Sequence, residues 1–168
     1  MIGDRSKFAF AGWVFLTLML LAFAKAIIAA IHFENLSKGF GVPAGGNPVC
    51  TLVSRKQLRK ARRTKRVIAC AVAICPWDVN CYPQAIVARV LLGIHGVPYT
   101  LNLGVRKAGP RNELEAHAWL HAGSCAVTGG GSYRSHVLVN CYGKQSWRPL
   151  VPALPPTLSR AAKGQAVR

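Results

Sequence analysis

The feature that most constrains the fold is a run of 24 mostly apolar residues, Phe8 to Ile31, in which Lys25 is the one charged residue. About 20 such residues cross a bilayer as a helix. A signal peptide has a shorter apolar core, about 7–15 residues, followed by a small-residue cleavage site. Because Ala29-Ala30-Ile31 is a poor cleavage site, the run predicts a retained helix. That helix either spans a membrane, lies in its interface or packs on the domain.

The chain is strongly basic, with 22 Lys and Arg against 5 Asp and Glu, a formal charge of +17. Since 51% of its residues are apolar, a disordered basic tail is excluded and a packed domain is expected. The charge predicts an acidic partner. Eight basic residues fall between 55 and 66, a segment without aromatic residues or a nucleic-acid recognition motif. An anionic lipid surface, or an acidic peptide or partner protein, is therefore favoured over nucleic acid. For a helix in the membrane, the positive-inside rule predicts a cytoplasmic domain, anchored to the inner face of the membrane through residues 8–31.

Two more helices are expected after the apolar run. Glycines and prolines at 39–48 predict a loop. Ser54 is a candidate N-cap for a basic helix over 55–75. An apolar helix is expected to begin at Cys81, with Gly96 at its C-terminal end.

The second half of the chain changes to a period of two, which is typical of strands. The expected strands are 99–105, 115–121, 125–127 and 133–142. Helices followed by an antiparallel sheet make an α+β fold. We expect three parts: an N-terminal apolar helix and linker over 1–50, a folded domain over 51–143, and a flexible tail over 144–168.

One cysteine and one histidine are placed for thiol chemistry. Cys81 is expected in the first turn of its helix, where backbone N–H groups and the helix dipole favour a thiolate. His117 falls on a strand further along. A thiolate can attack a carbonyl, an imidazole can carry the proton, and helix-terminal N–H groups can hold the oxyanion. A buried structural cysteine and a hydrogen-bonded strand histidine would leave the same spacing.

The other cysteines do not change this interpretation. A disulfide framework is typical of small secreted domains, so with a retained helix the six thiols are expected to be reduced. His121 and Cys125 raise the question of a metal site. The paired ligand spacing of a zinc site is absent from the sequence, so no metal is expected.

The sequence around Cys81 and His117 resembles one family. Residues 76–85 read PWDVNCYPQA, and residues 116–120 read AHAWL. With residues 91–106 and 127–130, these blocks resemble the lasso peptide maturation proteases of the stand-alone B type. These are transglutaminase-like (papain-like) cysteine peptidases. The resemblance covers about residues 55 to 142.

The resemblance implies a function. Such enzymes remove the leader from a ribosomally made precursor peptide, after which an asparagine-synthetase-like cyclase closes an isopeptide ring. Cys81 matches the nucleophile and His117 the general base. The stretch ahead of residue 55 is mostly one apolar helix, so we expect a separate leader-recognition protein to deliver the precursor. No cofactor is expected on this chain, and ATP would be a requirement of the cyclase.

The sequence departs from the family at the third catalytic position. Members with a full triad carry an Asp about a dozen residues after the His, whereas no Asp or Glu follows Glu115 here. The orienting group must therefore lie upstream, or be an amide or a backbone carbonyl, unless the site is a dyad. The candidates for a third member or for oxyanion support are Glu115, Asp78, Asn140 and Gln84.

Two other functions stay open at this point. The chain could be a non-catalytic, membrane-associated basic adaptor that recruits the precursor or its partners. It could also perform a related acyl transfer, such as transglutamination, on the same thiol. An adaptor would tolerate loss of Cys81 but not charge reversal across 55–66, and an acyl transferase would give an amine-linked product.

Overall fold

The computed structural model describes residues 2–30, 40–46, 49–109 and 113–144. The elements follow in this order: helix α1 (Ile2–Ala30), strand β1 (Val42–Gly45), helices α3 (Arg55–Ala73) and α4 (Cys81–Ile94), strands β2 (Tyr99–Ala108), β3 (Glu113–Ala122) and β4 (Cys125–Thr128), the short 3-10 helix η1 (Ser132–Ser135) and strand β5 (Val137–Lys144). The expected α+β class is confirmed. Apart from Lys144, the expected C-terminal tail lies outside the described residues.

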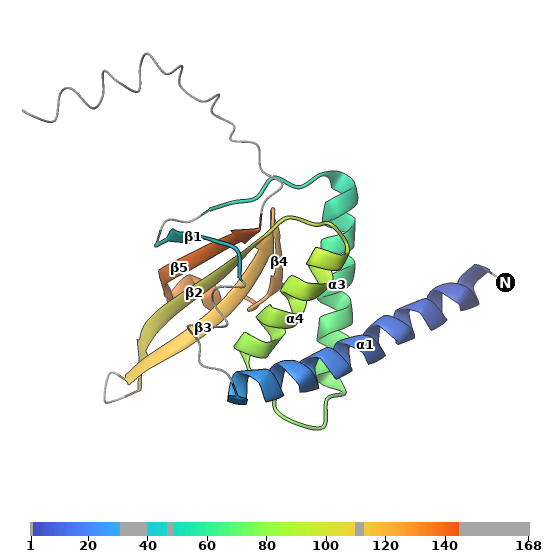
Figure 1. Cartoon of the computed structure of the whole chain (residues 1–168), viewed down its shortest axis with the longest axis horizontal. Coiled ribbons are helices and arrows are strands. Elements are labelled where there is room, and N and C mark those ends of the chain that lie inside the picture. The colour runs from blue at the N-terminus through green and yellow to red at the C-terminus, as the bar shows by residue number, and fades with distance from the viewer. Residues whose placement is uncertain (1, 31–39, 47–48, 110–112, 145–168) are drawn as a thin grey trace, which may run out of the picture.

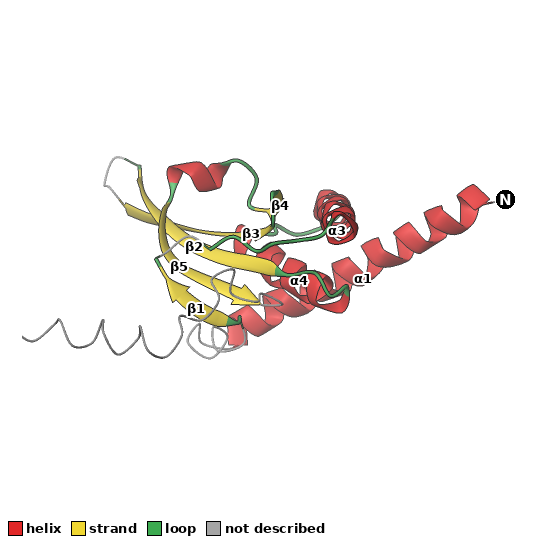
Figure 2. Ribbon diagram, turned by 90° about the horizontal axis from the view of Figure 1, so that it is seen from above, coloured by secondary structure: helices red, strands yellow, loops and turns green. Residues whose placement is uncertain are grey.

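The strands form one antiparallel sheet in the order β1-β5-β2-β3-β4. Figure 1 shows this sheet beside the helices, and Figure 2 shows α1, α3 and α4 gathered on one side of it. β2, β3 and β4 follow one another as neighbours. β5 then pairs with the other edge of β2, so β2 is the central strand, with β5 and β1 on one side of it and β3 and β4 on the other.

Two expected elements differ from the structure. The expected loop at 39–48 contains β1, in which Val42 pairs with Gly143 and Pro43 with Tyr142. β1 is an edge strand, and an edge strand tolerates proline because one side of its backbone has no partner. The expected strand over 133–142 begins only at Val137, because η1 occupies Ser132–Ser135.

The helix ends follow their sequence signals. Ser54 caps α3 with a full capping box: its Oγ accepts from the Gln57 N–H at 3.3 Å, and its own N–H donates to Gln57 Oε1 at 2.9 Å. α4 ends where Gly96 takes a φ of 62°, with the Val97 N–H donating to the Leu92 carbonyl at 2.9 Å. Both the Ser54 cap and the Gly96 stop are confirmed.

The core lies between the helices and the covered face of the sheet. α4 contributes Leu91 and Leu92, and the sheet contributes Leu101 and Leu120, all of them almost fully buried. α1 packs on α3 and α4 through its middle turns, while its N-terminal turns extend past the domain (Figure 1). All six cysteines are free thiols.

Candidate functional site

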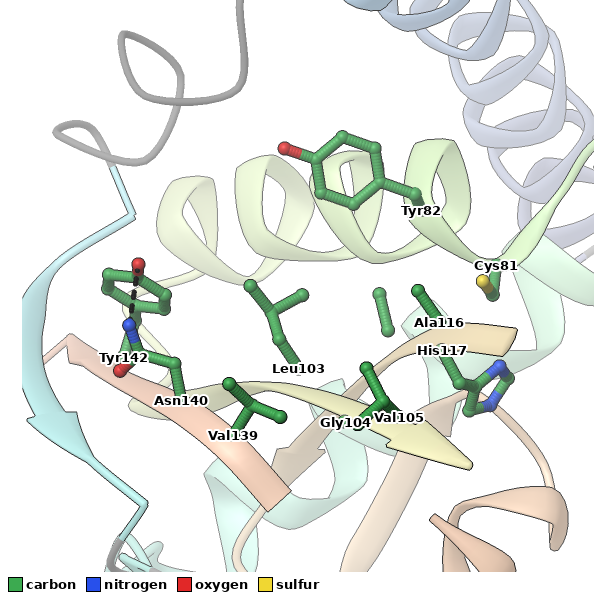
Figure 3. A pocket seen from close by; sticks show the side chains of 11 residues that line it. Cys81, Tyr82, Leu103, Gly104, Val105, Ala116, His117, Val139, Asn140 and Tyr142 are labelled. Carbon is green, nitrogen blue, oxygen red and sulfur yellow. Dashed lines mark hydrogen bonds between the residues drawn. The ribbon is translucent and has the colours of Figure 1, made fainter. Parts of the chain in front are cut away.

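A cavity of about 360 Å³ lies between the start of α4 and the strands β2, β3 and β5. Its wall is largely apolar, with Leu103, Val105, Ala116 and Val139 among the lining residues. Cys81 and His117 also line it, and they lie toward one end, with Asn140 and Tyr142 toward the other (Figure 3). The two residues expected to carry the chemistry therefore share one cavity.

Cys81 is the first residue of α4 and is half-buried. The N-cap residue, Asn80, makes no side-chain hydrogen bond to the helix. The first-turn N–H groups of α4 are consequently not occupied by this cap and can face an anion. Gln84, a candidate for oxyanion support, donates from Nε2 to the Val79 carbonyl at 2.9 Å. This bond ties the first turn of α4 to the segment before it.

His117 lies in the middle of β3, opposite Gly104 of β2. Its neighbours Ala118 and Leu120 belong to the core beneath the helices. Side chains alternate along a strand, so the imidazole of His117 points to the other face of β3. There its ring stacks on His136 at 4.8 Å and on Trp119 at 5.9 Å between centroids.

The Nε2 atom of His117 has two polar neighbours, the Gly129 carbonyl oxygen and the Ser132 hydroxyl, each at 3.1 Å. The Ser132 hydroxyl also donates to the Gly129 carbonyl at 3.0 Å. A carbonyl only accepts hydrogen bonds, so this network assigns the proton of the neutral ring to Nε2 and leaves Nδ1 as the basic nitrogen. Because Nε2 of His117 carries the proton, it cannot act as a base toward the Ser132 hydroxyl, and His117 does not activate Ser132 as a nucleophile.

Cys81 and His117 line the same cavity, but in the described structure the Cys81 thiol and the His117 imidazole form no hydrogen bond with each other. The reason is the alternation of β3, which turns Ala116 toward α4 and the His117 ring toward η1. Catalytic hydrogen bonds are often long without substrate and tighten when the substrate binds. The structure brings the pair to one cavity without closing the contact.

Glu115 and Asp78 are not partners of the His117 imidazole. The Glu115 carboxylate pairs with Arg106 on β2, with a shortest N···O distance of 2.7 Å, and both side chains are exposed. Asp78 is exposed in the segment between α3 and α4. Their roles as a third catalytic member therefore have no contact to support them.

Asn140 lines the cavity, yet its amide is also engaged elsewhere. Nδ2 donates to the Tyr142 hydroxyl at 2.9 Å, and Oδ1 accepts from the Cys141 N–H at 2.9 Å.

Burial raises the pKa of Tyr82, which also lines the cavity, to about 12, with Tyr142 adding to the rise and Arg89 opposing it. Tyr82 is thus a neutral phenol at the cavity wall.

Sequence reasoning did not identify Gly129, Ser132 or His136 as neighbours of His117. The sequence shows only a run of three glycines before Ser132. A backbone carbonyl leaves no residue type to search for, so only the general option of a carbonyl partner was available. Among the described residues no cluster of three His, Cys, Asp or Glu side chains is arranged to hold a metal ion.

Comparison with known families gives one match. A family model described as the transglutaminase-like superfamily matches residues 28–140, more than half of the chain. The matched range includes Cys81, His117 and every strand from β1 to β4. The superfamily contains cysteine peptidases and transglutaminases. No curated protein and no solved structure matches the chain significantly.

Proposed function

This chain belongs to the transglutaminase-like superfamily, and from this premise we propose that it is a cysteine peptidase that removes the leader of a lasso precursor peptide. The observation that carries the proposal is the shared cavity: Cys81 at the start of α4 and His117 on β3 both line it. The motif blocks around these two residues point to the leader-peptidase branch. A separate leader-recognition protein and an ATP-dependent cyclase complete the proposed system.

In the proposed mechanism the Nδ1 atom of His117 takes the proton of the Cys81 thiol. The thiolate attacks the scissile carbonyl, and first-turn N–H groups of α4 stabilise the oxyanion. The imidazolium then protonates the leaving amine, which frees the N-terminus of the core peptide and leaves a thioester on Cys81. Nδ1 next deprotonates a water molecule, which hydrolyses the thioester and releases the leader as a carboxylate.

The test compares the wild type with Cys81→Ala and with Cys75→Ala, a matched control because Cys75 is also a half-buried free thiol but lies outside the cavity lining. Each protein is incubated with the precursor and its recognition protein, and the products are weighed by mass spectrometry. Leader-sized fragments from the wild type and from Cys75→Ala, but not from Cys81→Ala, are expected. Undiminished cleavage by Cys81→Ala overturns the proposal.

Two other results would redirect it. An amine-linked product in place of a freed N-terminus would identify an acyl transferase. Processing that survives Cys81→Ala but is lost on charge reversal across residues 55–66 would identify the basic adaptor.

We also propose that α1 attaches the enzyme to the cytoplasmic face of an anionic membrane and lies along it. The segment Lys7–Ala30 is long and apolar enough to cross a membrane, and only 22% of its most apolar window is buried. One face of α1 packs on the domain through Val14, Thr17 and Leu21. The opposite face exposes large apolar side chains: Phe8, Phe15, Met19 and Phe23.

The packing of α1 favours a helix in the membrane plane. Its middle turns touch α3, whose outer face carries the eight basic residues between 55 and 66. If α1 spanned the bilayer, these charges would be drawn toward hydrocarbon, which costs about 2.5–3.5 kcal/mol for each charge at the centre. An interfacial helix buries its apolar face and keeps its basic neighbours at the headgroups.

A basic hollow beside α1 fits the same proposal. Lys7, Arg63 and Arg66, with Phe10, line a space of about 490 Å³ between α1 and α3. Among the described residues the only ion pair is Arg106–Glu115, so these three cations have no acidic partner there. Their charge complements the phosphate of an anionic lipid.

The membrane proposal is tested by sedimentation with vesicles of phosphatidylcholine alone or with added phosphatidylglycerol. The wild type should pellet with the anionic vesicles and remain in solution with the neutral ones. Phe15→Ser with Phe23→Ser, and separately Arg63→Glu with Arg66→Glu, should each weaken binding. The control is Val137→Ser, an exposed apolar residue on the sheet. Equal binding of wild type and both double variants would contradict the proposal.

A further inference from the structure

We infer that the Gly129 carbonyl and the Ser132 hydroxyl together replace the carboxylate that orients the catalytic histidine in a full triad. This inference rests on the proposed function, because it assigns a partner to the proposed general base. Gly129 and Ser132 are positioning residues: they act through His117 and not on the substrate.

Their geometry matches that role. Gly129 follows β4, the strand beside β3, and lies 12 residues after His117. Its carbonyl oxygen and the Ser132 Oγ are each 3.1 Å from Nε2, within hydrogen-bond range. Both bind the same nitrogen, which leaves Nδ1 for the thiol. A histidine held by an acceptor on one nitrogen keeps one tautomer and one ring orientation.

The fold excludes an acidic side chain at position 129. Gly129 has a φ of 87°, and a Cβ built there would lie 2.2 Å from the Cβ of Trp119. Trp119 is buried beneath this turn, so it has little room to move. The backbone after β4 is therefore pressed against β3, and the group it can offer to His117 is its own carbonyl.

His136 fixes this turn in place. Its Nδ1 donates to the Ser132 carbonyl at 2.8 Å, and its ring stacks on that of His117 at 4.8 Å. The orienting pair is held from two sides, by the Trp119 contact and by the His136 bond.

The acceptors are neutral, which sets the pH behaviour. The titratable groups near the ring are His136, which stacks on it, and Tyr133, which stacks on the neighbouring Trp119. Cys81 of α4 lines the same cavity, and Glu115 on β3 has its charge paired with Arg106. Two neutral acceptors stabilise an imidazolium less than a carboxylate does. The alkaline limb of activity should therefore respond to the group at position 132.

The experiment uses the full chain and three variants at one exposed position: Ser132→Ala, Ser132→Thr and Ser132→Asp. The matched control is Ser135→Ala, in the same 3-10 turn, where Ser135 Oγ donates to the Ser132 carbonyl and does not reach His117. Two quantities are measured: the pH profile of carbamidomethylation at Cys81, followed by peptide mapping, and the ¹⁵N shifts of the His117 ring. Precursor cleavage is followed in parallel.

Ser132→Ala should lower the rate of precursor cleavage about three- to ten-fold, which corresponds to the loss of one neutral hydrogen bond. It should also shift the alkaline limb of the pH–activity profile to lower pH. Ser132→Thr should restore both. Ser132→Asp should shift the alkaline limb of the pH–activity profile to higher pH by about one unit or more, because it places a carboxylate near Nε2 of His117. The wild-type ring should carry its proton on Nε2.

The inference fails if Ser132→Ala and Ser135→Ala have the same pH profile, or if the wild-type ring carries its proton on Nδ1. It stands apart from the peptidase proposal in one respect. If the wild type does not cleave the precursor while the ring shifts and the Cys81 profile follow position 132 as expected, the positioning role is upheld and the peptidase proposal falls.

Discussion

The carbonyl oxygen of Gly129 lies 3.1 Å from Nε2 of His117, 12 residues further along the chain. This contact assigns the ring proton to Nε2 and leaves Nδ1 free to act as a base. It depends on a glycine that approaches Trp119 too closely for any other residue. The close approach that leaves no room for a side chain at position 129 also brings the Gly129 carbonyl to His117.

Gly129→Ala should destabilise the protein strongly, whereas Gly130→Ala should have a smaller effect. Both glycines have a positive φ, 87° and 54°, so each alanine incurs left-handed strain of about 1–2 kcal/mol. Only at 129 does the new Cβ also collide with Trp119; at 130 nothing lies within 4 Å. Overpacking brings the total for Gly129→Ala to about 3 kcal/mol or more. Chemical denaturation measures both free energies of unfolding, and equal values would contradict the close approach.

Glu115→Gln should leave activity within about two-fold of the wild type and stability within about 0.5 kcal/mol, because Glu115 forms an exposed ion pair with Arg106. A third catalytic member would behave differently, since its loss would slow the reaction by orders of magnitude. Cleavage rates with the precursor and thermal unfolding give the two readouts. A large loss of rate at unchanged stability would restore Glu115 as the orienting group.

The apolar cavity should accept an apolar side chain of the substrate next to the scissile bond. Val139→Lys should therefore lower kcat/KM about ten-fold or more, since the ammonium group would oppose an apolar side chain there. Val139 lines the cavity and is 55% exposed, so the fold tolerates the change. Val137→Lys is the control, because Val137 lies on the same strand, is more exposed and does not line the cavity. Equal losses in both variants would argue against a substrate pocket at this site.

Trp13→Ala should raise the pKa of His95, because the Trp13 ring packs on His95 at 4.8 Å between centroids. Burial is the main cause that lowers the pKa of His95, and Lys60 and Arg63 lower it further. The variant should bring this pKa closer to its ordinary value but keep it below, since both cations remain. Titration of the histidine ring signals by NMR measures it. His121, whose pKa is also lowered by burial but which lies on β3, should not move.

The same group affects stability at acid pH. The folded-state pKa of His95 lies below its unfolded value, so the unfolded chain binds the proton first as the pH falls. His95 costs no stability above a pH of about 6.5, and stability is lost as the pH falls through that value. Trp13→Ala should make the free energy of unfolding less steep with pH in that window. An unchanged slope would mean that α1 does not pack on His95 in solution.

The sequence alone determined the features that depend on neighbours along the chain. The apolar run became α1, Ser54 capped α3, Gly96 ended α4, and period-two alternation placed β2 and β3. These are local effects of capping, backbone freedom and side-chain period, each visible within a few residues. The α+β class followed from the same local patterns.

The contacts between residues far apart in the sequence depend on the tertiary fold. β1 formed from a stretch of glycines and prolines because β5 offered it an edge, which no local pattern indicates. None of the four side chains weighed for the third catalytic position has a hydrogen bond to His117 in the described structure, whereas the Gly129 carbonyl oxygen lies 3.1 Å from its Nε2. Every residue has a backbone carbonyl, so residue type does not indicate which carbonyl will bond to a histidine. That depends on how β3, β4 and the buried Trp119 pack together, which is a long-range property of the fold.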